Sequence, residues 1–149
     1  MAAIVQNIIT QSKVLAAGIL GASYKELRFV YNVDKNDIRS AEKAYGVRPL
    51  EASPVETVTR VYTVDQRFEL ILTDTIGRSD DDTQRTDAMN VMYDKVDEIF
   101  KSLVNTKINL SSTVLNIVGP SISEPEFVLD NKLVILRMQY TVKYRSALV

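Results

Sequence analysis

The C-terminal part of the chain alternates apolar and polar residues, and this pattern constrains the fold more than any other feature. Within residues 132–145 every second side chain is apolar: Val134, Leu136, Met138, Tyr140, Val142 and Tyr144. The side chains between them are polar or charged: Arg137, Gln139, Thr141, Lys143 and Arg145. A period of two predicts a long strand. Its apolar face should pack on helices, and its other face should meet water or a partner.

Two amphipathic helices are predicted to cover that apolar face. In residues 3–20 apolar side chains recur at helical spacing, and Gly21 follows as a plausible C-terminal cap. The second helix is predicted over residues 82–104, where the apolar positions fall three and four residues apart. Its stripe consists of Met89, Met92, Val96, Ile99, Phe100 and Leu103.

Shorter strands complete the predicted sheet. They are expected at residues 27–33, 56–64, 67–73, 114–118 and 127–129. Asp65 and Gln66 form either a tight turn between two strands or a bulge within one long strand, and the sequence does not decide between these readings. Residues 34–55 lack periodicity and are predicted to form a long polar loop with one short helix.

The order of these elements indicates one α+β domain over residues 1–149. We expect a largely antiparallel sheet packed against two long amphipathic helices, with a long loop after the first strand. The N-terminal helix is interrupted by polar residues, and its uncharged run is shorter than the ~20 residues that span a membrane. We therefore expect neither a signal peptide nor a membrane span.

The chain contains no histidine and no cysteine. Thiol nucleophiles, thiolate zinc sites and His-dependent triads are therefore excluded. Asp80, Asp81 and Asp82 could hold a hard cation, but capping of the following helix explains them better. Ser40 and Lys43 match the serine acyl-enzyme spacing, and the companion motifs are absent. We predict no catalytic residue, no metal site and no cofactor.

The overall charge excludes a strongly basic nucleic-acid-binding protein. Lys and Arg number 18 against 19 Asp and Glu, a formal charge of -1. Arg137, Lys143 and Arg145 nevertheless project from one face of the last strand. They could attract phosphate, or they could be a solvated strand face or a charged sheet edge. The second reading is favoured because no aromatic residue is interleaved on that face.

The segment of residues 45–49 has an unusual composition for a loop. It is made up of Tyr45, Gly46, Val47, Arg48 and Pro49. Tyr and Arg are enriched at protein interfaces, which suggests a contact region. Gly and Pro also mark ordinary turns, and in that case the tyrosine would pack over the core. The sequence leaves both readings open.

Residues 44–74 read AYGVRPLEASPVETVTRVYTVDQRFELILTD, and a helix with a central Tyr93 follows. Together with the closing Tyr144-Arg145, this text resembles the tail terminator proteins of tailed bacteriophages. The resemblance implies a homo-oligomeric ring, usually of six subunits, at the head-proximal end of the tail tube. Such a ring ends tube polymerisation and joins the tail to a neck or head–tail connector protein. DNA passes through it without being read, and no membrane or cofactor is involved.

The resemblance also implies a place and a set of contacts. The protein would be assembled in the host cytoplasm and reside in the tail or neck region of the virion. Besides residues 45–49, the candidate contacts to tube, neck or neighbour are Thr63, Asp65, Gln66 and Phe68. Arg137, Lys143 and Arg145 would face the DNA lumen or the outer surface. The alternatives are another neck or minor tail protein, a small nucleic-acid-binding module that uses the basic strand face, and a metal enzyme centred on residues 80–82.

Overall fold

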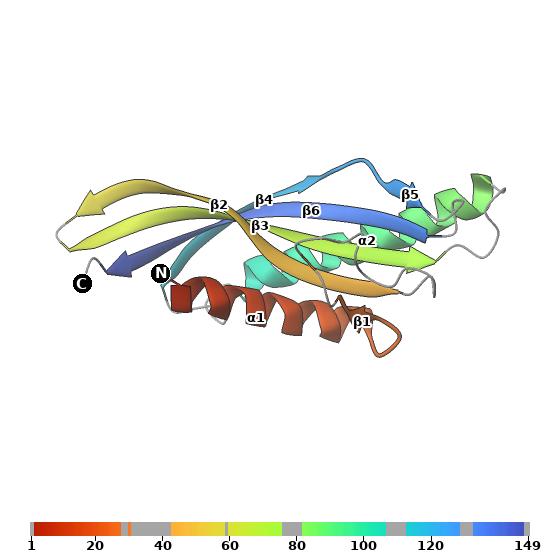
Figure 1. The fold of residues 1–149 in the computed structure, drawn as a ribbon, viewed down its shortest axis with the longest axis horizontal. Coiled ribbons are helices and arrows are strands. Elements are labelled where there is room, and N and C mark those ends of the chain that lie inside the picture. The colour runs from red at the N-terminus through yellow and green to blue at the C-terminus, as the bar shows by residue number, and fades with distance from the viewer. Residues whose placement is uncertain are drawn as a thin grey trace.

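The computed structural model describes residues 2–27, 30, 43–58, 60–75, 82–106, 113–128 and 133–147. These residues form two helices and six strands (Figure 1). In chain order they are α1 (Ala2–Leu20), β1 (Lys25–Glu26), β2 (Ala44–Val58), β3 (Val61–Thr75), α2 (Asp82–Asn105), β4 (Val114–Ile122), β5 (Glu126–Val128) and β6 (Leu133–Ala147).

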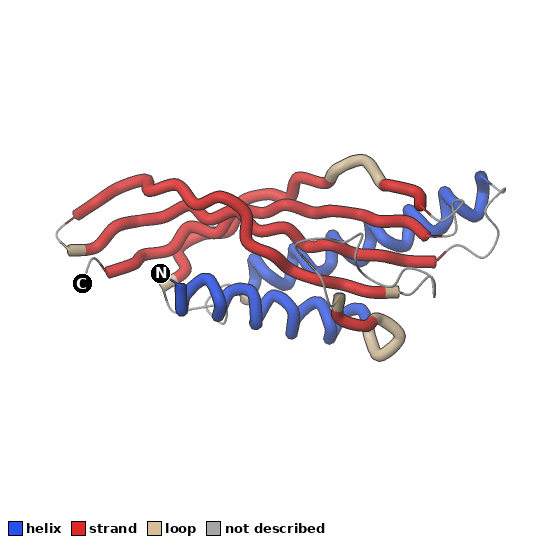
Figure 2. Tube along the Cα trace, in the orientation of Figure 1, coloured by secondary structure: helices blue, strands red, loops and turns tan. Residues whose placement is uncertain are grey.

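The six strands form one mixed sheet. Its order is β1-β2-β3-β6-β4, and β5 also pairs with β6. Every pairing is antiparallel except that of the two-residue β1 with β2. The predicted α+β class and the largely antiparallel sheet are therefore confirmed, with one short parallel pairing added. Figure 2 shows both helices extending along the long axis of the strands.

Both helices pack on the same face of the sheet. The apolar residues predicted for one face of β6, residues 134–144 at every second position, are all buried there. They meet four buried side chains from each helix, which are Ile8, Ile9, Ala16 and Leu20 of α1 and Met92, Val96, Ile99 and Leu103 of α2. The predicted stripe on α2 is confirmed at these buried positions. Burying this apolar surface is the main favourable term for the fold.

The helix α1 ends where the sequence indicates. Gly21 has a φ of 86°, and its backbone N–H donates to the Ala17 carbonyl at 3.0 Å, as in an αL cap. By length and composition alone α1 could cross a membrane. In this structure it lies against the sheet, and the Tyr140 hydroxyl donates to Ser12 Oγ at 3.0 Å between two buried side chains.

The strand β2 is the largest departure from the prediction. Residues 44–55 were expected in a loop, yet they belong to a 15-residue strand. Of the strand expected at residues 27–33 the structure describes Leu27 and Val30, and neither lies in a strand, while the rest lies outside the described residues. The short strand described beside β2 is β1, just before this segment. β2 contains Pro49 and Pro54 and shifts register against β3 twice. Prolines and bulges are typical of strands near a sheet edge, and they remove the alternation by which a strand is recognised.

Residues 61–75 form a single continuous strand, so the turn considered at Asp65 and Gln66 is wrong. The chain reverses earlier, where Val58 pairs with Val61 and Arg60 has a φ of 64°. The predicted strand over residues 56–64 therefore spans a hairpin turn. The irregularity lies in β2 instead, and Gln66 Nε2 donates to its Leu50 carbonyl at 2.7 Å. Gln66, which the sequence suggests as a turn residue, instead donates a hydrogen bond to a carbonyl at the bulge in the neighbouring strand.

Near the C-terminus the predicted strands differ from the structure only at their ends. β4 continues through the cis peptide bond between Gly119 and Pro120 and ends at Ile122. β5 falls where a short strand was expected. Residues 34–42 of the predicted loop, which would hold most of its short helix, lie outside the described residues.

Candidate assembly surface

The face of the sheet opposite the helices carries a polar network centred on Glu69. Arg48, Glu69 and Gln139 are direct cross-strand partners on β2, β3 and β6. Arg48 Nη2 lies 2.8 Å from Glu69 Oε1, and Arg137 Nη1 lies 3.2 Å from the same oxygen. Gln139 Nε2 donates to Glu69 Oε2 at 3.3 Å. The Glu69 side chain is only 4% exposed, so its charge is satisfied almost entirely by these neighbours.

The network continues toward both sides of the sheet. Arg137 Nε also lies 3.2 Å from Glu126 Oε1 on β5. Arg67 donates both to Glu51 on β2 and to Gln139 on β6. The polar contacts therefore connect β2, β3, β5 and β6 across one face. They hold the register of the long strands on the side that neither helix covers.

A small apolar cluster covers one end of the same face. Ile71, Leu133 and Ile135 are buried there, and Leu27 and Val128 pack on them. The backbone of Gly46 lies beneath this cluster, since a Cβ built on it would be 2.5 Å from Val30 Cγ1. Gly46 is therefore required by a close approach between segments, and not by a flexible turn.

The predicted contact segment at residues 45–49 is mostly inside the molecule. Tyr45 and Val47 are buried in the core beneath the helices, which agrees with the reading that placed the tyrosine over the core. Gly46 is buried on the opposite face. Arg48 and Pro49 are half-buried and reach the surface. The structure thus leaves Arg48 and Pro49 as the members of this segment that an outside partner could touch.

The second predicted group, on β3, is divided between the two faces. Gln66 and Phe68 are buried on the helix side, and the Phe68 ring stacks on Tyr140 with centroids 5.7 Å apart. Thr63 and Asp65 are half-buried on the other face. Alternation along a strand separates these residues, so they do not form one patch.

The three predicted basic residues also have different surroundings. Arg137 is held by Glu69 and Glu126, so its charge is largely neutralised. Lys143 is half-buried and Arg145 is exposed, and neither forms an ion pair with a described residue. The described charged side chains of this face are Arg48, Arg67, Arg137, Lys143 and Arg145 against Glu51, Asp65, Glu69 and Glu126. This near balance makes the face a poor phosphate-binding platform.

A cluster that the sequence did not reveal fixes the segment after α1. The Tyr24 hydroxyl donates to Asp74 Oδ2 at 2.7 Å, and burial followed by this contact raises the pKa of Tyr24. Lys43 Nζ and Lys95 Nζ lie 5.6 and 5.7 Å from the centre of the Tyr24 ring. These contacts join the end of β3, the start of β2 and the middle of α2. Because these residues come together only through the pairing of distant segments, no local sequence motif predicts the cluster.

The described part of the chain contains no group of three His, Cys, Asp or Glu side chains that could hold a metal ion. Asp82 begins α2, and its Oδ1 lies 2.5 Å from Arg85 Nη1. This pairing fits the helix-terminus reading of that carboxylate. Asp80, Asp81 and Ser40 lie outside the described residues.

Comparisons with known proteins give a likeness in fold. No protein-family model matches the chain, and no curated protein is similar to it in sequence. Among solved structures, a chain of the virion of a native gene transfer agent particle has a similar fold, with a TM-score of 0.52 and 10% sequence identity. The match covers 93% of this chain and 92% of that chain. At this identity the likeness establishes a shared fold over nearly the whole domain.

Proposed function

We propose that this protein is a structural component of a phage-like virion, and specifically a tail terminator-like ring at the head-proximal end of the tail tube. The observation that carries the proposal is the fold shared, over nearly full length, with a chain of a gene transfer agent virion. The resemblance of residues 44–74 to tail terminators points to the same class of particle. We propose no catalytic step for the chain.

Two sides of the sheet support assembly into a ring. β1 pairs with only the first two residues of β2, so residues 46–58 have no described strand on their outer side. β4 likewise has no described strand beyond it. The two edges lie on opposite sides of the sheet and differ in sequence. Contacts between unlike surfaces are heterologous, and they close into a ring when the rotation between copies allows it.

The face of the sheet opposite the helices carries a nearly balanced charge, which supports passage of DNA without binding it. Arg48, Arg67 and Arg137 are each bound to a carboxylate within the chain. A face of this kind, turned toward a lumen, would release few counterions to phosphate. We propose that this face borders the DNA path, and that the tube protein and the neck or connector protein are the axial partners. The protein would then reside in the tail or neck region of the virion.

Two experiments test this role. Light scattering on the purified protein should give a closed species several times 16.8 kDa. Images of single particles would then give the symmetry of the ring. Removing the gene from the virus that encodes it should give tail tubes of uncontrolled length that lack heads. Tails of normal length with heads attached would contradict the terminator role. Normal tubes with unattached heads would support another neck protein.

A second candidate function rests on Lys143 and Arg145, which have no ion-pair partner among the described residues. They could give a small module salt-dependent affinity for nucleic acid. Replacing both by glutamine would abolish that affinity, whereas Arg137 should be kept because it also stabilises Glu69. A DNA titration of the wild-type protein that shows no binding at low salt would exclude this alternative.

A further inference from the structure

We propose that two copies of this chain meet head to tail, with the tip of the sheet in one copy docked on the outer face of α2 in the next. The sheet tip is defined here as Arg60, Val61, Thr63 and Arg145. The outer stripe of α2 is defined as Asp87, Val91, Asp94 and Glu98. The inference deepens the proposed ring and rests on it, because it names the surfaces through which neighbouring subunits would join.

The outer stripe of α2 has a consistent character. Its four residues follow one another at spacings of four, three and four, so they lie along one side of the helix. All four are exposed, and Val91 is 47% exposed. None of the three carboxylates forms an ion pair with a described residue, whereas Asp97 is paired with Lys101 at 2.8 Å. The stripe is therefore an apolar side chain between acids that have no ion-pair partner among the described residues.

The sheet tip has the opposite charge around a similar apolar residue. Arg60 lies in the turn of the β2–β3 hairpin with a φ of 64°, and Val61 beside it is 37% exposed. Arg145 on β6 is the cross-strand partner of Thr63 and is exposed. Neither arginine forms an ion pair with a described residue. Among the described side chains, the tip thus presents a valine between cations, which matches the valine between carboxylates on α2.

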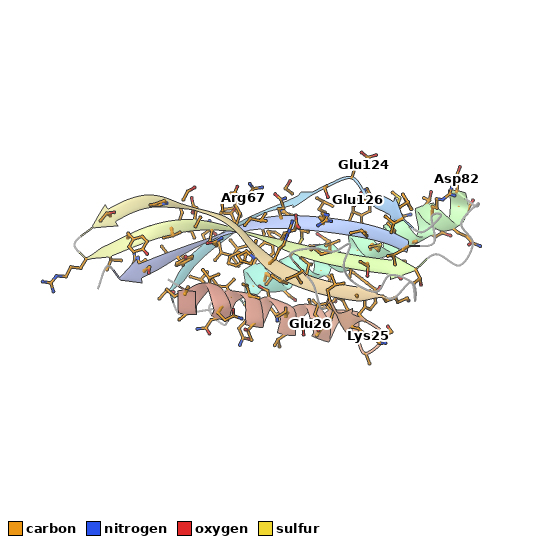
Figure 3. The ribbon with its side chains drawn as sticks, viewed as in Figure 1. Lys25, Glu26, Arg67, Asp82, Glu124 and Glu126 are labelled. Carbon is orange, nitrogen blue, oxygen red and sulfur yellow. The ribbon has the colours of Figure 1, made fainter. Side chains whose placement is uncertain are left out.

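The two surfaces lie too far apart to meet within one chain. Figure 1 shows the β2–β3 hairpin reaching one end of the long axis, beyond the start of α1, while α2 begins at the other end. Figure 3 labels Asp82, the first residue of α2, at that far end. A contact between the tip and the stripe must therefore join two molecules. Since the surfaces differ, the contact is heterologous and repeats into a ring or a filament.

The contact follows the ordinary logic of a protein interface. Val61 and Val91 would supply the apolar centre, and the arginines and carboxylates around them would fix the register and suppress wrong pairings. The formal charge of -1 means that whole-molecule repulsion does not oppose association. Because the charged groups are exposed, the contact should weaken as salt rises.

Charge reversal on each side provides the test, measured by light scattering and sedimentation over a range of concentrations. The helix variant is Asp94→Arg/Glu98→Arg, and the tip variant is Arg60→Glu/Arg145→Glu. Each alone places like charges against each other, and we expect self-association to weaken roughly tenfold or more. Mixed in equal amounts, the two variants should assemble again, because every acidic tip meets a basic helix and every basic tip an acidic helix.

The control is Glu124→Arg, which reverses an exposed carboxylate outside both surfaces (Figure 3) and breaks no ion pair among the described residues. It should assemble as the wild-type chain does. If either charge-reversal variant self-associates normally, the proposed contact is wrong, and a ring would have to form through other surfaces. A mixture that fails to recover also overturns it. A wild-type chain that stays monomeric up to millimolar concentration overturns the contact as well, and ring formation on tube ends is then tested separately by the gene removal described above.

Discussion

Arg48 and Glu69 face each other across β2 and β3, with Arg48 Nη2 2.8 Å from Glu69 Oε1, on the face of the sheet opposite α1 and α2. Arg137 reaches the same oxygen from β6. The carboxylate is nearly buried, and the described side chains around it supply its ion-pair and hydrogen-bond partners. One negative charge thus links three long strands, on the same face as the small apolar cluster of Ile71, Leu133 and Ile135.

Neutralising Glu69 should therefore destabilise the sheet. Glu69→Gln keeps the shape of the side chain, leaves the partly buried Arg48 without its carboxylate partner and leaves Arg137 with Glu126 alone. Removing one member of a buried ion pair is strongly destabilising, and here the arginines are about a quarter exposed, so we expect a loss of about 2–3 kcal/mol. Urea unfolding measures it. Glu51→Gln, at an exposed ion pair, should change little. Equal losses in both variants would show that the central position of Glu69 is unimportant.

Adding a methyl group at Gly46 should cost stability through one identified clash. The new Cβ would lie 2.5 Å from Val30 Cγ1 and 3.3 Å from Leu27, so Gly46→Ala should lose about 1–3 kcal/mol in urea unfolding. Removing the opposing group with Val30→Ala should recover part of that loss. Gly18→Ala is the matched control, since nothing lies within 4 Å of its new Cβ, and it should stabilise α1 by roughly 0.5–1 kcal/mol. If Val30→Ala gives no recovery, the close approach is not the cause.

The parts of the fold with strong periodicity could be predicted from the sequence. The alternation in β6 and the helical stripe of α2 reflect burial on one face, and burial is what a hydrophobic pattern records. β2 could not be predicted, because Pro49, Pro54 and two register shifts remove the pattern while backbone pairing with β3 maintains the strand. The local composition of residues 44–55 favours a loop, whereas their backbone pairing with β3 makes them part of a strand.

The candidate assembly surface also has features that the sequence predicts and features that it does not. The sequence places Arg137 on the polar face of β6, and the structure confirms that position. That Glu69 and Glu126 would neutralise Arg137 depends on the register of three strands, which no local pattern encodes. The contact role given to Tyr45 and Val47 rests on residue type and on the resemblance to tail terminators, and their burial follows from a strand that the sequence did not predict. Which surfaces meet a partner stays a prediction.

Removing the amide of Gln66 should weaken the β2–β3 pairing at the bulge. Its Nε2 donates to the Leu50 carbonyl at 2.7 Å and to the Glu51 carbonyl at 3.3 Å from a buried position. Gln66→Met keeps the length of the side chain and deletes the donor, which should cost about 1–3 kcal/mol because a partly buried carbonyl loses its partner. Thermal unfolding followed by circular dichroism measures the change. Gln6→Met on the exposed side of α1 is the control, and a similar fall in both variants would remove the special role of Gln66.

The attachment of α1 to the sheet should be visible in the alkaline stability of the protein. Burial raises the pKa of Tyr140, whose hydroxyl donates to Ser12 Oγ at 3.0 Å. A tyrosine ionises in the unfolded chain near pH 10, and in the folded chain only at higher pH. The unfolded state therefore loses its proton first, so this stability is fully present below about pH 10 and is lost as the pH rises toward the folded value.

Tyr140→Phe should make that alkaline loss shallower, by up to about 1.4 kcal/mol per pH unit, because one buried ionisable group is removed. At pH 7 the variant should lose about 0.5–1.5 kcal/mol, the usual net worth of a hydrogen bond. Urea unfolding between pH 7 and pH 11 gives both quantities. Ser12→Ala should lower stability at pH 7, and the double variant should lose less than the sum of the two single losses, since both remove the same contact. Strictly additive losses and an unchanged alkaline slope would mean that Tyr140 is not held against α1 in solution.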